Sequence, residues 1–306
     1  MPKVDRPLFA LLLRILAAFA GASLLALVKR ASESGIALPE IMFWRQAIPV
    51  PLLLAYLWVS GGLDRLRTRR LGSHAKRAGL GMTNMVLNFG AVILLPLAES
   101  TALGFTTPLF AVVLAALVWR QHIGPWRWTA VALGFAGVIV IAHPGGAAIA
   151  PLGAAVALTA ALLIAVINFQ IRDLGRTEHP ITTSFYFAAF GAPLAALALP
   201  FYMTAHTPAQ WGLLIGIGVT GTLFQLLLTA SLRYGAVASV IVMDYTSLVW
   251  ATGYGWLLWD RFPPASTWLG APLIIAAGLV IIWREHHLAK NRSAPAAVAP
   301  SGPAAL

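Results

Sequence analysis

The chain has 306 residues, of which 59% are hydrophobic and 10% charged, and its mean hydropathy is +0.81. This composition excludes a water-soluble globular protein, whose surface needs far more polar side chains. The net charge of +11 does not indicate nucleic-acid binding, because the basic residues lie in short loops between apolar segments and form no amphipathic face. The absence of cysteine excludes disulfides and cysteine-ligated metals. We expect an all-α integral membrane protein with no resident metal or cofactor.

Ten apolar segments are predicted to be transmembrane helices, since a helix needs about 20 such residues to cross the hydrocarbon core. In chain order they cover residues 8–28, 39–59, 78–96, 98–119, 126–142, 151–171, 181–203, 210–232, 236–259 and 267–283. The first segment follows two basic residues, as a signal peptide does, but it is long enough to span and carries Arg14, so we expect it to be retained. Residues 291–306 are rich in Pro and Ala and are predicted to be a disordered tail.

The distribution of Lys and Arg predicts the orientation of these helices. With the N-terminus in the cytoplasm, sixteen basic residues fall on the cytoplasmic side, whereas the outside loops hold only Lys29, Arg30 and Arg261. One helix more or fewer would move every later loop to the other side and destroy this asymmetry. The sequence therefore predicts a multi-pass protein of the cell inner membrane with both termini in the cytoplasm.

An internal repeat appears when the sequence is shifted by 140 positions. The shift aligns 104–110 with 244–250 and Trp119 with Trp259, and one insertion later a Gly-Val-Ile-Val-Ile segment aligns with Gly-Leu-Val-Ile-Ile. Chance alignment of apolar, glycine-rich sequence is the alternative. Against it, the loop after the second predicted helix holds six Lys or Arg, whereas the matching loop after the seventh holds none. Matched loops of opposite charge are typical of halves that cross the membrane in opposite directions.

Two inverted five-helix repeats around a central cavity are therefore predicted, the first over residues 1–147 and the second over 148–290. Inverted repeats are typical of secondary transporters, because exchanging the conformations of two similar halves converts an outward-open state into an inward-open one. We expect alternating access, a small-molecule substrate and the lipid bilayer as partners, and no nucleic acid. The sequence leaves the oligomeric state open and is compatible with a monomer.

The fourth and fifth segments, chiefly 98–119 and 134–138, resemble the EamA-type branch of the drug/metabolite transporter superfamily. Within that branch, the run 43–46 together with Asn84 and Asn88 is similar to the aromatic amino-acid exporter group called YddG. The resemblance covers nearly the whole chain. It implies a transporter that exports aromatic and other amino acids, with helices one to four and six to nine lining the cavity.

Ionisable side chains within the predicted spans are candidates for function, because they are costly at bilayer depth. Asp244 is the deepest acid and is a candidate for binding a substrate ammonium or a coupled proton, with a structural acid as the alternative. Arg14 lies close enough to the cytoplasmic interface for snorkelling to be expected. Arg45 and Glu99 lie near the outer ends of their helices and are expected to pair, as an outer gate, a substrate-carboxylate site or a structural bridge.

Polar and aromatic side chains complete the predicted cavity, with helix packing as the alternative role for each. The candidate substrate-binding residues are Trp44, Arg45, Asn84, Asn88, Thr106, Thr107, Gln225, Asp244, Tyr245 and Trp250. Proline removes a backbone hydrogen bond and permits bending, so Pro49, Pro108 and Pro193 are hinge candidates, against the alternative of static kinks.

Other function classes fit the sequence less well. A membrane-embedded enzyme would need two deep acids, a His-Glu-x-x-His motif or a histidine within a span, and the sequence has none of these, so we predict no enzymatic activity. A channel would need a selectivity-filter pattern. Within the same superfamily, a carrier of drugs or other small metabolites is the alternative. Organic phosphates would favour several deep basic residues, and only Arg45 qualifies.

Overall fold

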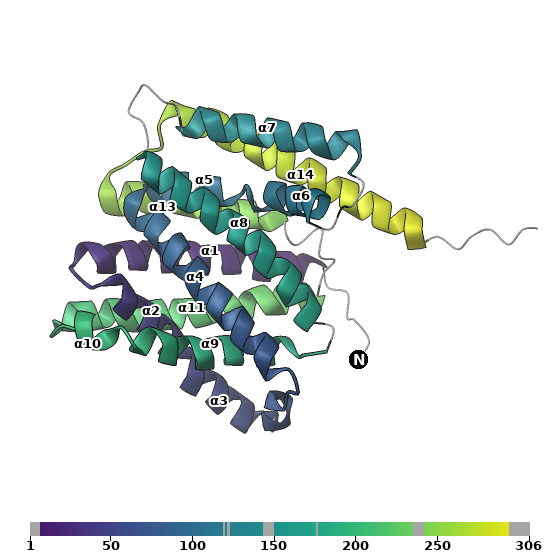
Figure 1. Ribbon diagram of the computed structural model, residues 1–306. Coiled ribbons are helices and arrows are strands. Elements are labelled where there is room, and N and C mark those ends of the chain that lie inside the picture. Colours follow the sequence, from purple (N-terminus) through teal and green to yellow (C-terminus); the bar gives the residue numbers. More distant parts are fainter. Residues whose placement is uncertain are drawn as a thin grey trace, which may run out of the picture.

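Helices form all of the regular secondary structure in the part of the chain that the computed structural model describes, namely residues 7–118, 120, 123–142, 150–175, 177–234 and 242–293. Residues 294–306 of the predicted C-terminal tail and part of the ninth predicted helix lie outside these residues, whereas 291–293, predicted as the start of that tail, continue the last helix. In Figure 1 the long helices lie alongside one another in a bundle, with α7 and α14 forming a pair at one side.

The first half of the chain contains the helices of five predicted spans. They are α1 (Pro7–Glu33), α2 (Leu38–Ala47), α3 (Pro49–Val59), α4 (Leu71–Leu94), α5 (Leu97–Gly104), α6 (Thr107–Leu117) and α7 (Pro125–Ala142), with the 3-10 helix η1 (Leu63–Leu66) before α4. Two spans are each divided into two helices, between α2 and α3 and between α5 and α6. Proline follows each break, at Pro49 and Pro108, because its ring and missing N–H favour the start of a helix over its interior.

The second half contains the helices of the other five predicted spans. Its elements are α8 (Pro151–Leu174), α9 (Pro180–Ala196), α10 (Leu199–Tyr202), α11 (Pro208–Tyr234), the 3-10 helix η2 (Val242–Thr246), α13 (Ser247–Trp259) and α14 (Ala265–Ser293). Proline is the first residue of α8, α9 and α11, where the missing N–H costs nothing.

Within the residues that the structure describes, seven helical segments are long and apolar enough to cross a membrane. They are Leu8–Glu33, Leu38–Val59, Leu97–Leu117, Pro125–Ala142, Pro151–Ile171, Pro208–Ser231 and Ala265–Arg284. The other three predicted spans correspond to α4, whose first turns are basic, to the short α9, and to α13 with η2. The count of ten spans stays a prediction for these three.

The most extensive packing joins helices of the two halves: α1 lies against α11, α4 against α8, α2 against α9 and α7 against α14. The backbones of α7 and α14 approach closely at two glycines. A Cβ atom on Gly137 would lie 2.7 Å from the carbonyl oxygen of Gly270, and one on Gly270 would lie 2.5 Å from that of Gly137. Small residues permit such contact between membrane helices.

Two residues that the predicted repeat aligns share an unusual backbone conformation. Arg120 and Asp260, which follow the aligned pair Trp119 and Trp259, both have φ of 49° and are the non-glycine residues with positive φ in the described part of the chain. At Asp260 this left-handed residue ends α13, and its N–H donates to the carbonyl of Trp256 at 2.9 Å.

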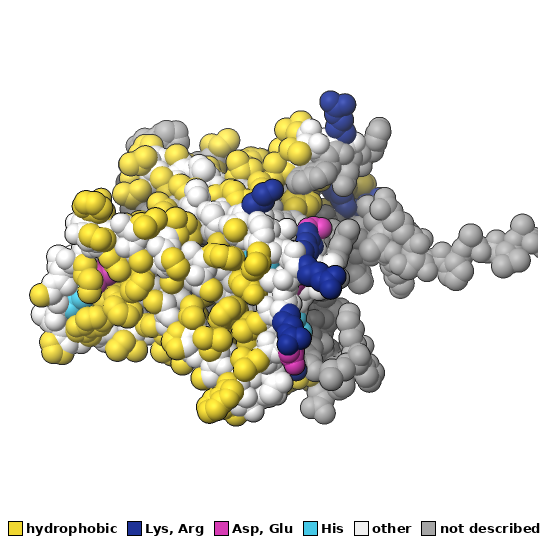
Figure 2. Space-filling model, turned by 60° about the horizontal axis from the view of Figure 1, so that its bottom comes forward, with side chains coloured by type: hydrophobic (Ala, Val, Ile, Leu, Met, Phe, Trp, Pro, Cys, Tyr) yellow, Lys and Arg dark blue, Asp and Glu magenta, His cyan; other side chains and the backbone are white. Residues whose placement is uncertain are grey.

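Hydrophobic side chains cover most of the surface in Figure 2, whereas Lys and Arg gather at one end of the molecule. We call this the basic end and assign to it the segment between α3 and α4, which carries Arg65, Arg67 and Arg70, and the first turns of α4, which carry Lys76. Trp58 and Trp126 are among many large apolar side chains that are more than half exposed. An apolar surface of this extent fits lipid, with tryptophan favoured near the membrane interfaces.

Candidate functional site

An ion pair joins Arg14 of α1 to Asp244 of η2. Arg14 Nε donates to Asp244 Oδ1 and Arg14 Nη2 donates to Oδ2, both at 2.5 Å. The Arg14 side chain is 7% exposed and the Asp244 side chain 41%. The prediction that Arg14 snorkels to the interface is therefore wrong. A bidentate carboxylate compensates the buried guanidinium within the protein, so the side chain turns inward.

Aromatic side chains with unused donors lie near this pair. The Tyr245 hydroxyl and the Trp250 indole nitrogen are buried and have no hydrogen-bond partner. The Tyr245 ring packs edge-on against Phe105 at 4.8 Å, and the Trp250 ring against Phe19 at 5.0 Å. Asp244, Tyr245 and Trp250, which were predicted as cavity residues, thus belong to one region formed by η2 and α13 against α1 and α5.

Arg45 is buried between α2 and α11 without a carboxylate partner among the described residues. Its Nη1 donates to Gln46 Oε1 at 3.3 Å and its Nη2 to the carbonyl of Gly221 at 3.4 Å. Its Nε has no partner. Gln46 in turn donates to the carbonyl of Phe187 on α9 at 3.1 Å. The neutral contacts are long and leave the positive charge uncompensated.

The structure does not join Arg45 to Glu99, although the sequence predicted that they pair. Glu99 is buried in α5, on the side of the bundle that faces α8 and α13, whereas α2 packs against α9 and α11. Glu99 lies within electrostatic reach of Lys29 and Arg261. Lys29 Nζ donates to the carbonyls of Val92 at 3.1 Å and Leu95 at 2.5 Å. The two residues of the predicted gate therefore belong to different polar groups.

A cavity of about 200 Å³ lies beside Lys29. Glu33, Trp259 and Arg261 also line it, and the Trp259 indole donates to both Glu33 carboxylate oxygens, at 2.7 and 2.8 Å. The guanidinium of Arg30 lies 5.9 Å from the Trp259 ring centroid. The three basic residues predicted outside the membrane thus gather around one tryptophan.

Some of the other predicted cavity residues have hydrogen-bond partners for their polar side-chain atoms, and others do not. Thr106 Oγ1 donates to the carbonyl of Leu103 at 2.6 Å, and Thr107 Oγ1 to that of Gly104 at 2.9 Å, so both donors are used within the helix break. In contrast, the Trp44 indole nitrogen and Asn84 Oδ1 are buried without a partner. Trp44 packs edge-on against Trp211 of α11 at 5.1 Å.

Asn88 and Gln225 are half-buried, on α4 and α11. Of the hinge candidates, Pro49 and Pro108 lie at helix breaks, whereas Pro193 lies inside α9. A second, apolar cavity of about 340 Å³ lies between α2, α4 and α9, lined partly by Met42, Met82 and Leu194.

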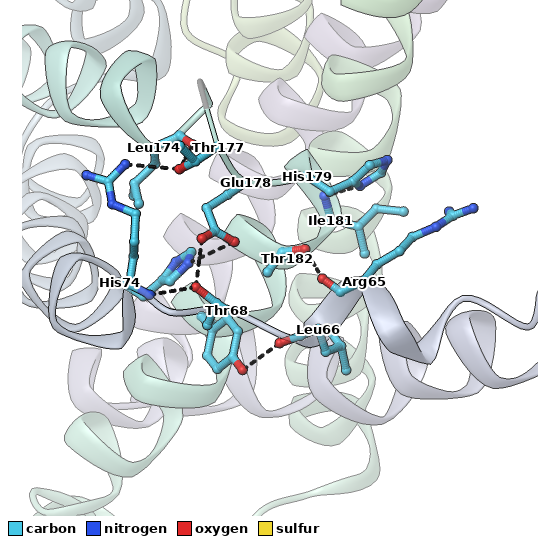
Figure 3. Close-up of polar contacts among 12 residues, drawn as sticks. Arg65, Leu66, Thr68, His74, Leu174, Thr177, Glu178, His179, Ile181 and Thr182 are labelled. Carbon is cyan, nitrogen blue, oxygen red and sulfur yellow. Dashed lines mark hydrogen bonds and ion pairs between the residues drawn. The ribbon is translucent and has the colours of Figure 1, made fainter. Parts of the chain in front are cut away.

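At the basic end, a polar network joins the segment before α4 to the segment before α9. Figure 3 shows the Glu178 carboxylate between Thr68, which donates to it at 2.7 Å, and His74, whose Nε2 lies 3.7 Å away. The Tyr186 hydroxyl donates to the carbonyl of Leu66 at 2.8 Å, and Thr182 donates to that of Arg65. Burial lowers the pKa of His74, and the nearby Glu178 carboxylate opposes this effect.

At the opposite end, the His206 imidazole Nε2 contacts Glu40 Oε1, and both side chains are almost completely buried. Glu40 lies in the first turn of α2, and His206 in the segment between α10 and α11. The His206 ring packs edge-on against Trp211 at 5.4 Å. Both histidine–glutamate pairs were missed from the sequence. Each member lies outside or at the start of an apolar segment, where a charged residue is ordinary.

We next compared the sequence with models of known protein families. The model of the EamA-like transporter family matches residues 8–143 and again residues 151–283. The chain belongs to the EamA-like transporter family. This confirms the branch of the drug/metabolite transporter superfamily that the sequence resembles.

Curated relatives of this EamA-like transporter carry different cargo. It is 31% identical to the pseudopaline exporter CntI of Pseudomonas aeruginosa, covering 88% of this chain and 94% of the relative. It is 28% identical to a riboflavin transporter of Vibrio cholerae (85% and 88%) and 27% identical to an S-adenosylmethionine uptake transporter of Rickettsia bellii (80% and 84%). A solved crystal structure has the same fold, with a TM-score of 0.63, 20% identity and coverage of 92% of this chain and 99% of that one.

Proposed function

We propose that this transporter exports small amino-acid-like metabolites, which carry a carboxylate and an amine, from the cytoplasm by alternating access. The observation that carries the proposal is the buried, uncompensated charge of Arg45. A buried cation without an anion is costly, and a substrate carboxylate would supply two charge-assisted hydrogen bonds where the chain supplies long neutral ones.

We assign Asp244 to the substrate amine at a second point of the transport path, because Arg45 lies at the level of the Gly21–Phe224 contact, about two turns of α1 from Arg14. Both Asp244 carboxylate oxygens accept hydrogen bonds from the Arg14 guanidinium, but the Asp244 side chain is partly exposed. A substrate amine can therefore approach the carboxylate from its exposed side and compete with Arg14. Trp44, Asn84, Tyr245 and Trp250 present unused polar atoms from α2, α4, η2 and α13. Aromatic rings with few fixed polar groups suit substrates with varied side chains.

The pattern of helix contacts supports two equivalent halves, over residues 1–147 and 148–290. If α8 corresponds to α1 and α11 to α4, the contact of α1 with α11 is repeated by that of α8 with α4. The contact of α1 with α13 is likewise repeated by that of α8 with α6. The shared left-handed conformation of Arg120 and Asp260 adds a match at residue level. We assign the basic end, with both termini, to the cytoplasm on the positive-inside rule.

The direction and the breadth of cargo are the finer parts of the proposal. The relative named as an exporter supports export, whereas those named for riboflavin and S-adenosylmethionine uptake support the alternative of another small metabolite. None of the relatives described above is named for aromatic amino acids, so the similarity to the YddG group rests on the sequence resemblance.

Transport by purified protein in liposomes tests the proposal. The panel pairs each labelled amino acid with the amine that lacks its carboxylate, and adds riboflavin and S-adenosylmethionine as competitors. We expect amino acids to be carried and their amines to be carried poorly, and we expect Arg45→Met to lower amino-acid transport by about 30-fold or more, the cost of losing a buried charged partner. The exposed Arg65→Gln is the control. Equal transport of amino acid and amine, or wild-type rates in Arg45→Met, would refute the carboxylate site.

A further inference from the structure

Two histidine–glutamate pairs bridge the two halves of the chain, one at each end of the molecule. At the basic end, His74 of the first half meets Glu178 of the second. At the opposite end, Glu40 of the first half meets His206 of the second. Each of the four side chains is at most 8% exposed.

The two pairs lie near the starts of corresponding helices in the proposed repeat. Glu40 lies at the start of α2 and Glu178 two residues before α9, its counterpart. His74 lies in the first turn of α4 and His206 two residues before α11, its counterpart. Exchanging the halves therefore brings each pair to the end of the molecule that the other occupies, near the starts of the corresponding helices. A duplicated contact that closes opposite ends is what alternating access requires of its gates.

The two pairs differ in closure. The outer pair, Glu40 and His206, is in direct hydrogen-bonding contact. In the inner pair, the nearest nitrogen and oxygen are 3.7 Å apart, neither His74 nitrogen has a hydrogen-bond partner, and Glu178 accepts from Thr68 instead. One end is thus tightly joined while the equivalent contact at the other end is loose.

Protonation of the imidazole would give each pair opposite charges and so strengthen the contact. Around His74 the charged or titratable groups are Glu178, Arg70, Arg77 and the Tyr186 phenol, whose ring lies 4.8 Å from the imidazole. Beside the outer pair, the Trp211 ring lies 5.4 Å from the imidazole, and α2 carries the cation Arg45 after Glu40. His206 Nδ1 and Glu40 Oε2 have no partner. An imidazolium facing a buried carboxylate is held strongly, whereas a neutral imidazole is held by at most one hydrogen bond.

We propose that Glu40–His206 and His74–Glu178 are proton-binding latches, which hold the outer and inner ends closed when the histidine carries a proton. The proposal rests on the proposed function of alternating access. Because the two latches are related by the repeat, a proton lost from one end and gained at the other exchanges which end is open. Protons are thereby assigned as the ligand that sets the conformation.

The test uses the natural absence of cysteine, which allows spin labels to be placed without removing any residue. Labels at Arg69→Cys and Gly175→Cys report the distance between the halves at the inner end, and labels at Ser34→Cys and Thr204→Cys report it at the outer end. All four positions are exposed. Distances are measured by pulsed electron resonance in lipid nanodiscs, without substrate, from about pH 5 to about pH 8, the range in which histidine titrates.

We expect the open population at each end to grow as the pH rises. His206→Gln and Glu40→Gln should each shift the outer open-to-closed ratio by about tenfold or more and abolish its pH dependence, while the inner distance still responds to pH. His74→Gln and Glu178→Gln should do the same at the inner end. Asp64→Asn is the control, because the Asp64–Arg67 pair is exposed and lies within one half. Glu40→Asp, which keeps the charge, tests the outer end if the glutamine variants unfold.

Unchanged outer distances in both Glu40→Gln and His206→Gln, or pH dependence that survives in them, would overturn the latches. This outcome is separate from the proposed cargo, because the distances need no substrate. Latches that respond to pH in a protein that carries no amino acid would refute the cargo alone. Amino-acid transport with distances that do not respond to pH would refute the latches alone.

Discussion

Because Arg14 is buried, it needs the Asp244 carboxylate as its counterion, and this limits which substitutions Asp244 tolerates. Asp244→Asn would leave Arg14 buried without a counterion, so we expect a loss of about 1 to 3 kcal/mol in the free energy of unfolding, below the cost for a fully buried pair because Asp244 is 41% exposed. Thermal unfolding in detergent measures this loss.

The double variant Arg14→Leu with Asp244→Asn separates the structural role of this pair from its role in transport. It should recover most of the lost stability, because no unpaired charge remains. It should still fail to transport amines if Asp244 binds the substrate ammonium. Wild-type transport by a stable double variant would show that Asp244 is a structural acid.

Residue type alone was enough to single out Asp244 and Arg45, because few ionisable side chains occur in the apolar segments. Their partners could not be predicted. Arg14 and Asp244 are separated by 230 positions, and nothing in a single sequence says that α1 packs against η2. The prediction paired Arg45 with Glu99 by depth in the membrane, and depth does not say which side of the bundle a helix faces.

At the scale of the helix, the glycines of α7 and α14 fix how closely the two helices pack. Gly137→Ala would place a methyl group 2.7 Å from a backbone oxygen that cannot move without displacing α14. We expect a loss of about 1 to 3 kcal/mol in stability. Gly212→Ala in α11 is the matched control, since a Cβ there meets nothing within 4 Å, and it should leave the melting temperature unchanged or raise it slightly. Equal melting temperatures for the two variants would contradict close packing at Gly137.

The break at Pro49 separates α2, which carries Glu40 and Arg45, from α3. If this break is a hinge, Pro49→Ala lets the two helices merge and should slow transport several-fold while substrate affinity is retained. Pro272→Ala, within α14, is the control for removing a proline from a helix. Initial rates and equilibrium binding in the same preparation distinguish a hinge from a static kink, for which the rates of Pro49→Ala would equal those of the natural chain.

Helix positions followed largely from local sequence, because proline at the first helical turn and runs of apolar residues act over short distances. Proline was also the reason to expect bending at Pro49 and Pro108, where the structure divides the spans. The contacts between helices were not, since apolar segments facing lipid and apolar segments facing protein look alike in sequence.

At the scale of the whole molecule, the orientation in the membrane is inferred from the Lys and Arg residues of the loops. Chemical labelling from each side of the membrane tests this orientation. The single variants Arg69→Cys, at the basic end, and Thr204→Cys, in the segment before α11, place an exposed thiol at each end of a chain that otherwise has none. A membrane-impermeant maleimide should label Thr204→Cys in intact cells or spheroplasts and Arg69→Cys only in inverted vesicles. The reverse pattern would place the basic end outside the cell. The names of the inner and outer latches would then be exchanged, and the proposed orientation of the exporter would be wrong. Labelling of both sites from one side would contradict a bundle that spans the membrane between them.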